Sequence, residues 1–281
     1  MKLVVFDLDE TLGYFTEYGI FWDCLLNYIN LKNKDTLTQK DFNEILDLFP
    51  EFLRPNIINI LTYLKSKKKS KCCDKMLIYT NNQGPKEWAK HIVNYFENKI
   101  KAKLFNQIIS AFKVNGKLVE ICRSTHNKTH QDLMKCTRIP EDAEICFLDD
   151  TYYPEMANDN IYYINVKPYY YDLKFEDMIN IFENSKCGKK IIGNDSDFNE
   201  SMMTEFKRYK YDIIEKDPKE YEIDNLLGKQ IVLHLREFFK RSNSNKLKVK
   251  NTKTQKNTKT QRNTKTQKNI NSKRNKTQRN N

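Results

Sequence analysis

Two pairs of aspartates follow short apolar runs of the sequence, where their side chains could act together. The first pair follows the run LVVF and the second follows the run EICFL; the residues are Asp7, Asp9, Asp149 and Asp150. Sites in parallel α/β sheets form at the carboxyl ends of strands, so we expect the four carboxylates in one crevice. Carboxylates that converge repel each other unless a cation lies among them, and hard oxygen ligands select Mg²⁺ rather than zinc. The sequence therefore predicts a magnesium site formed by these four aspartates.

A third apolar run ends in residues that could hold a phosphate group. A phosphate monoester requires a hydroxyl and a cation for its non-bridging oxygens while charge shifts in the reaction. Thr80 ends the run MLIYT, so its hydroxyl could meet the phosphate beside the backbone N–H groups of Asn81 and Asn82. We therefore expect Thr80 and Asn81 to contribute to phosphate binding.

Lys128 is the expected cation of this phosphate site. It begins a helical pattern 21 residues before the second aspartate pair, and its ammonium group could reach the same crevice. Lys113 and Lys117 compete for the role from a predicted hairpin. His126 and His130 flank Lys128, but no third ligand has zinc spacing, which favours exposed residues at a helix start.

The elements that must position these residues alternate along the chain. Buried strands are predicted at 3–6, 76–80, 144–148 and 161–166. Helical patterns occur at 55–64, 86–96 and 129–137. The dipeptide Asn115–Gly116 predicts a hairpin between 108–114 and 117–121. Strands that alternate with helices indicate an α/β fold with a parallel sheet flanked by helices.

The domain organisation follows from these patterns. We expect a catalytic domain over 1–185, in which 13–52 form an insertion rich in aromatic residues. This insertion is either a small cap over a site or a packed loop and helix, and its aromatic residues favour core packing over a substrate platform. A helical C-terminal extension is expected over 186–240, with a last helix at 224–241.

All of the net positive charge of +12 lies in the last part of the chain. Residues 241–281 contain 14 Lys and Arg and no acidic residue, which leaves 35 basic and 37 acidic residues before them. The repeated unit NTKTQK has almost nothing apolar to bury, so we expect a disordered basic tail. This tail is either a solubilising run or a non-specific contact for RNA, DNA or an acidic partner.

The cysteines and the apolar runs indicate the cellular compartment in which we expect the protein. Seven cysteines are scattered without C-x-x-C spacing, so neither a disulfide framework nor a zinc site is expected. Carboxylates lie within the first ten residues, which does not fit a signal peptide. No run approaches 18 apolar residues, so no membrane span is expected. We expect an intracellular protein, cytoplasmic or nuclear and not secreted.

Together, the motifs VVFDLDETLG, LIYTNN, Lys128 and FLDD resemble in order and spacing the four motifs of the haloacid dehalogenase superfamily of phosphohydrolases. The resemblance covers about residues 1–185 and implies a Rossmann-like parallel sheet. It also implies that Asp7 attacks phosphorus and becomes an aspartyl-phosphate. Asp9 would protonate the leaving oxygen and then deprotonate water. Mg²⁺ would lie between the Asp7 carboxylate, the Asp9 carbonyl and Asp149 or Asp150.

Within this superfamily, several segments resemble the branch that dephosphorylates the carboxy-terminal domain of RNA polymerase II and related phosphoproteins. They are DLDETL, FLRPNIINILTYL, LDDTYYPEM and NDNIYYINVKPYY. This resemblance implies a phosphatase for phosphoserine or phosphothreonine in proteins. A phosphatase for small molecules, nucleotides or nucleic-acid ends is the alternative within the superfamily. A third hypothesis is a binding module that keeps the fold while the basic tail tethers nucleic acid.

Overall fold

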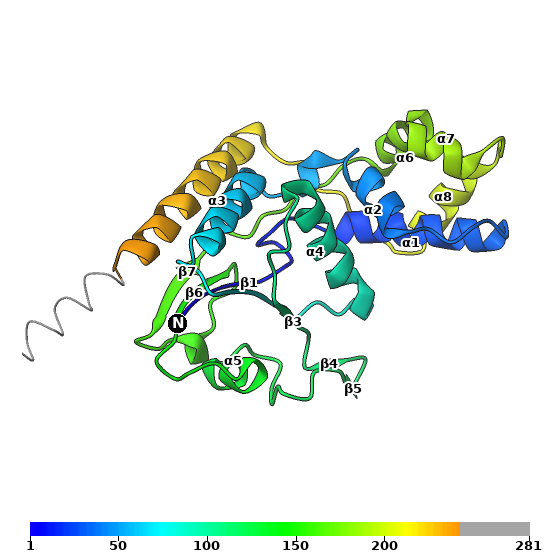
Figure 1. The fold of residues 1–281 in the computed structure, drawn as a ribbon. Helices are drawn as coiled ribbons and strands as arrows, with labels where there is room; N and C mark the ends of the chain where they lie inside the picture. Colours follow the sequence, from blue (N-terminus) through cyan, green and yellow to red (C-terminus); the bar gives the residue numbers. More distant parts are fainter. Residues whose placement is uncertain (242–281) are drawn as a thin grey trace, which may run out of the picture. The chain divides into compact units, whose positions relative to one another are not determined.

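A parallel five-stranded sheet flanked by helices forms the centre of the fold (Figure 1). The computed structural model describes residues 1–241, of which Met1–Leu235 form one compact unit. In spatial order the strands are β3 (Gln107–Ile109), β2 (Lys75–Tyr79), β1 (Lys2–Phe6), β6 (Glu144–Asp149) and β7 (Ile161–Asn165). All four pairs of neighbouring strands are parallel, which confirms the predicted α/β sheet.

Strand β1 lies at the middle of the sheet because its side chains can be buried on both faces. Its last four residues are all buried, as a continuous apolar run in a parallel sheet predicts. Phe6 is in register with Ile78 of β2 and with Leu148 of β6. The residues that follow these three strands therefore meet at one edge.

The sheet has one strand that the sequence does not predict as a member. The segment 108–114 is expected as a single arm of a hairpin, but Gln107–Ile109 pair with β2 as β3. The hairpin itself is confirmed in a shorter form, with β4 (Lys113–Val114) antiparallel to β5 (Lys117–Leu118). Asn115 and Gly116 have φ angles of 51° and 76°, the left-handed conformations that a tight turn of this kind requires.

Helices cover the two faces of the sheet. Leu133 of α5 (His130–Thr137) packs with Val5, Leu77 and Phe147 in one hydrophobic cluster on one face. Helices α3 (Ile57–Lys69) and α4 (Lys86–Ile100) lie on the other side of the sheet in Figure 1. These helices fix the loops between the strands.

A second group of helices combines segments that are far apart in the sequence. From 13–52 come α1 (Thr16–Leu31), α2 (Gln39–Leu46) and a 3-10 turn, η1 (Pro50–Phe52). They pack with α6 (Phe175–Asn184), α7 (Lys186–Ile192) and α8 (Phe198–Lys207) (Figure 1). Ring centroids of Phe21 and Phe182 lie 5.6 Å apart, and those of Tyr28 and Phe198 lie 5.0 Å apart. We call these helices the helical group.

The last described helix spans 218–241 and begins earlier than the predicted 224. Gly228 of this helix approaches the chain just before α3, where Asn56 Nδ2 donates to the Gly228 carbonyl oxygen at 3.0 Å. A Cβ atom at Gly228 would lie 2.3 Å from the Pro55 carbonyl oxygen, so only glycine allows this approach. Residues 242–281, which hold nearly all of the predicted disordered tail, lie outside the described residues. Among the described helices, none is long and apolar enough to cross a membrane.

Candidate active site

The carboxyl ends of β1 and β6 bring two aspartates and a lysine into contact. Lys128, just before α5, places its ammonium group in contact with Asp7 Oδ1 and 2.6 Å from Asp149 Oδ2. All three residues are buried. Tyr79 and Tyr153 line the ammonium group, with ring centroids 5.9 and 5.5 Å from Lys128 Nζ. The site therefore holds a cation between two carboxylates, shielded from bulk water.

Burial and charge act in opposite directions on these groups. Burial raises the pKa of Asp7 and of Asp149, and the attraction of Lys128 opposes that rise. For Lys128, burial acts against the charged form, but the two carboxylates outweigh it, so its pKa is raised. A lysine that remains protonated can hold the oxygens of an anion at this position.

Asp150 completes a group of three carboxylates with Asp7 and Asp149. One oxygen of each lies within 4.8 Å of the others. The Thr11 hydroxyl donates to Asp150 Oδ1 at 3.0 Å and accepts from the Asp150 backbone N–H at 3.1 Å. Three hard oxygen donors at this spacing suit a cation such as Mg²⁺. This group could therefore hold the predicted metal ion, while the Asp9 carboxylate lies outside it.

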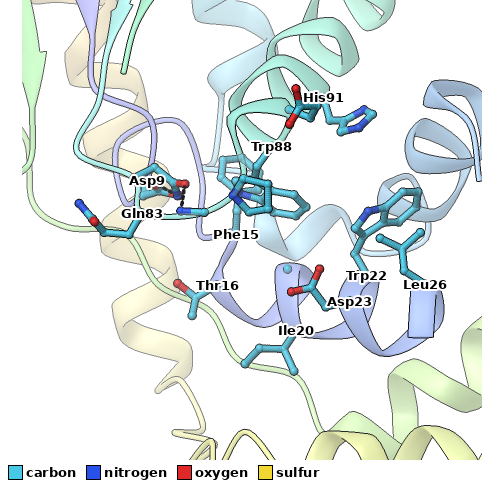
Figure 2. Close-up of a pocket in the computed structure, with 15 residues that line it drawn as sticks. Asp9, Phe15, Thr16, Ile20, Trp22, Asp23, Leu26, Gln83, Trp88 and His91 are labelled. Atoms are coloured by element: carbon cyan, nitrogen blue, oxygen red, sulfur yellow. Dashed lines mark hydrogen bonds between the residues drawn. The ribbon is translucent and has the colours of Figure 1, made fainter. Parts of the chain in front are cut away.

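Asp9 faces a different set of neighbours. Its Oδ2 accepts a hydrogen bond from Asn82 Nδ2 at 2.8 Å (Figure 2). Burial, followed by the neighbouring charge of Asp7, raises the pKa of Asp9 to about 7, although the bond from Asn82 opposes this rise. A carboxyl group that still holds its proton near neutral pH can serve as a general acid. Asn82, which the sequence suggests only for its backbone N–H, is the side chain that orients it.

Thr80 follows β2 at the same edge of the sheet and is buried. Its hydroxyl accepts from the Asn82 backbone N–H at 3.0 Å. The Asn81 side chain is already engaged, since its Nδ2 donates to the Tyr153 hydroxyl at 3.0 Å and its Oδ1 accepts from Arg123 at 2.8 Å. The Asn81 side chain therefore stabilises the loop, and only the backbone N–H of Asn81 is left to bind phosphate as expected.

Arg123 supports this loop and is not singled out by the sequence. The guanidinium group is buried and donates to the carbonyl oxygens of Thr80 at 3.0 Å and Ser110 at 2.9 Å. A further bond reaches the His126 carbonyl at 2.9 Å, on the segment that leads to Lys128. Arg123 therefore ties the segment after β2 to the segment that carries the lysine. A lone arginine in a loop gives no sequence signal for such contacts.

Arg54 supports the opposite side of the site. It is buried and donates to the carbonyl oxygens of Thr11 at 2.6 Å, Lys167 at 2.8 Å and Glu10. Burial lowers its pKa to about 10, an effect that the charge of Asp224 opposes. Arg54 therefore holds the turn after β1 in place. The only sequence signal is the arginine–proline pair, which bears on the site solely through the family resemblance.

The structure distinguishes Lys128 from Lys113 and Lys117, the alternative lysines for the phosphate-binding role. Lys113 places its ammonium group 5.0 Å from the ring centroid of the preceding phenylalanine. Lys128 is the lysine that contacts the site carboxylates, and neither Lys113 nor Lys117 forms a described ion pair with them. His126 is exposed as expected, whereas His130 is half-buried and burial lowers its pKa.

No disulfide framework was expected from the sequence, and the described residues contain one disulfide bond that the cysteine spacing did not predict. Cys122 and Cys136 are disulfide-bonded, and their Cα atoms lie 5.0 Å apart. The fold brings together the segment before Lys128 and the end of α5, and a separation of 14 residues has no spacing motif that would predict this. The bond links both ends of the segment that carries the lysine.

Comparison of the chain with protein-family models, curated proteins and solved structures gave no match.

Proposed function

We propose that the protein is a Mg²⁺-dependent phosphatase that hydrolyses phosphate monoesters through an aspartyl-phosphate at Asp7. The observation that carries the proposal is the contact of Lys128 with both Asp7 and Asp149, buried beside a third carboxylate. A cation held between carboxylates is suited to bind a phosphoryl group next to a nucleophile. The order of the motifs along the chain, which resembles that of haloacid dehalogenase phosphohydrolases, supports the same function.

The reaction would have two steps. An Asp7 oxygen attacks phosphorus, the bond from phosphorus to the leaving oxygen breaks, and Asp9 gives its proton to that oxygen. Asp9, now a carboxylate, then takes a proton from a water molecule. The water oxygen attacks phosphorus, which breaks the bond to Asp7 and releases inorganic phosphate.

The other residues would hold charge in place during both steps. Lys128 and the Thr80 hydroxyl would bind the non-bridging oxygens, while Arg54 and Arg123 keep their loops fixed. Asp7, Asp149 or Asp150, together with the Asp9 carbonyl, would hold Mg²⁺, which would neutralise phosphate charge when bound. Without Mg²⁺, the charge of the three carboxylates would be only partly balanced by Lys128, and they would repel an incoming phosphate dianion.

Two substrate classes fit the proposed reaction. Phosphoserine or phosphothreonine in a protein is the substrate that the family resemblance implies. A small-molecule monoester is favoured by a specific observation, a cavity of about 500 Å³ that reaches Asp9, because such cavities enclose small ligands. Both candidates require the same chemical steps.

Turnover of p-nitrophenyl phosphate by the full chain tests the proposal. We expect hydrolysis that depends on added Mg²⁺ and stops with chelator, and a fall of at least about 10³-fold for Asp7→Asn, which removes the nucleophile. Circular dichroism of the variant provides the control for folding. Equal turnover by Asp7→Asn, or equal rates after exhaustive chelation, would contradict the mechanism.

A further inference from the structure

A cavity of about 500 Å³ opens between α1 and the start of α4, next to Asp9 (Figure 2). Its walls are largely apolar and aromatic, with Phe15, Ile20, Trp22 and Trp88 among the lining residues. The volume lies within the range of sites that enclose one small molecule or one side chain. The insertion 13–52 thus supplies one wall of a cavity at the proposed active site. It is more than a packed loop and helix, the alternative that the sequence left open.

The aromatic wall is held in a fixed position by rings behind it. Trp88 packs against Tyr18 and Phe42, with ring centroids 5.9 and 5.5 Å apart, and Phe42 also contacts Trp22 at 5.1 Å. Gly19 of α1 faces Trp88, and its lack of a side chain leaves the tryptophan ring close to the helix. Trp88 is 9% exposed and Trp22 is 5% exposed, so only a small part of each ring is open to the cavity. A rigid wall of this kind binds a flat apolar group with little loss of entropy.

The position of Asp9 decides which part of a substrate enters the cavity. Asp9 lines it, and under the proposed function Asp9 gives its proton to the oxygen of the leaving group. Whatever is bonded to that oxygen must therefore extend from Asp9. The apolar space that adjoins Asp9 is the place for it.

The charges around the cavity restrict the leaving group further. The carboxylates of Asp23 and Glu87 line it, and no lysine or arginine is among the lining side chains that the structure describes. A second phosphate or a carboxylate on the leaving group would face like charges here, which disfavours binding. A neutral or cationic aromatic group would not be repelled in this way.

From these observations, and resting on the proposed phosphatase function, we propose that the physiological substrates are aryl phosphates. The aromatic ring bonded to the phosphate oxygen would occupy the cavity between α1 and α4, as the side chain of phosphotyrosine would. Trp88 and Trp22 would contact the ring, and the carboxylates of Asp23 and Glu87 would disfavour anionic rings. Phosphoserine lacks a group that fills this space.

The test compares O-phosphotyrosine with O-phosphoserine, which share the amino-acid backbone and differ in the ring. We expect wild-type kcat/KM to favour phosphotyrosine. Because the intrinsic reactivity of each ester is the same for every variant, the informative quantity is the change in this ratio on substitution. Trp88→Ala should lower the ratio roughly tenfold or more, since the loss of an apolar contact is worth about 10–200-fold in discrimination. Trp88→Phe should lower it less.

Leu31→Ala is the matched control, because Leu31 lies at the end of α1, is 73% exposed and does not line the cavity. Its ratio should equal that of the wild type. A ratio unchanged in both Trp88 variants would overturn the assignment of the cavity while leaving the phosphatase proposal intact. Hydrolysis of neither ester, nor of p-nitrophenyl phosphate, would instead contradict the proposed function itself.

A second arm uses charge and does not depend on the folding of the Trp88 variants. Phenyl phosphate and 4-carboxyphenyl phosphate differ by one negative charge on the ring. Asp23→Asn should raise kcat/KM for the carboxylated ester several-fold relative to phenyl phosphate, because one repelling charge is removed. A relative rate that is unchanged or lower would show that the ring lies elsewhere.

Discussion

The edge of the sheet and the helical group are stabilised in opposite ways. At the edge, the buried residues are charged, and Lys128 lies between Asp7 and Asp149. In the helical group, the buried residues are mostly rings, such as Phe21 against Phe175 at 5.7 Å. Buried ions depend on their partners, because removal of one leaves an uncompensated charge. Packed rings depend mainly on volume, so the same degree of burial has different consequences for function in the two regions.

Of the substitutions that compare these two regions, the loss of Lys128 should have the largest effect, because it removes the central charge of the sheet edge. In Lys128→Met, two buried carboxylates lose their common cation, and we expect the free energy of unfolding to fall by about 3–5 kcal/mol. Turnover of p-nitrophenyl phosphate should fall at least about 10²–10³-fold. Urea denaturation and steady-state kinetics measure the two effects. Lys113→Met is the matched control and should change neither; an active, fully stable Lys128→Met would show that the edge does not depend on its cation.

Phe21 offers the corresponding test of the helical group. The side chain is buried and contacts Phe49, Phe175 and Phe182. Phe21→Ala should lower the free energy of unfolding by about 3–5 kcal/mol through the cavity it leaves. Below the melting transition, turnover of phosphoserine should stay within a few-fold of wild type, since no group at the sheet edge is changed.

The corresponding measurements are a thermal melt and kinetics at a temperature where the variant is folded. If folded Phe21→Ala loses as much phosphoserine turnover as Lys128→Met loses with the same ester, the two regions are not separable in function.

The smallest expected effect concerns Asp9 and the electrostatics of the sheet edge. Asp9 must be protonated to act as the proposed general acid, so we expect kcat to fall as the pH rises through its pKa of about 7. Asn82 donates to the ionised form and lowers this pKa, so Asn82→Ala should move the alkaline limb of the profile upward by about one pH unit. The measurement is kcat against pH, with the exposed neighbour Gln83→Ala as control. A limb that moves to lower pH would contradict this assignment.

The sequence predicted the centre of the sheet because its strands are continuous apolar runs. Such runs can be recognised without knowledge of their neighbours, and the polar residue after each one marks the edge. Asp7, Thr80 and Asp149 could therefore be assigned to one edge from the sequence alone. β3 was not predicted as a separate strand, because its three residues continue into the arm of a hairpin.

What the sequence did not predict depends on contacts between distant residues. Arg54 binds the Lys167 carbonyl, 113 residues further on, and Arg123 binds the Thr80 carbonyl, 43 residues before it. No local sequence pattern indicates these hydrogen-bond partners. The packing of α1 against α8 is of the same kind, since each helix shows only an apolar face and not its partner. The disulfide between Cys122 and Cys136 likewise follows from the fold alone.

The central position of β1 also has a consequence for biosynthesis. Asp7 is synthesised 121 residues before Lys128. Strand β6, which pairs with β1 on one side, is synthesised later still. Until then, β1 can pair only with β2, and one edge of the run LVVF stays open to other chains. The nascent chain thus carries Asp7, the proposed nucleophile, for a long part of translation before Lys128 and Asp149 can contact it. Premature termination before β6 should yield an aggregation-prone fragment that lacks the contacts of Asp7 with Lys128 and of Lys128 with Asp149.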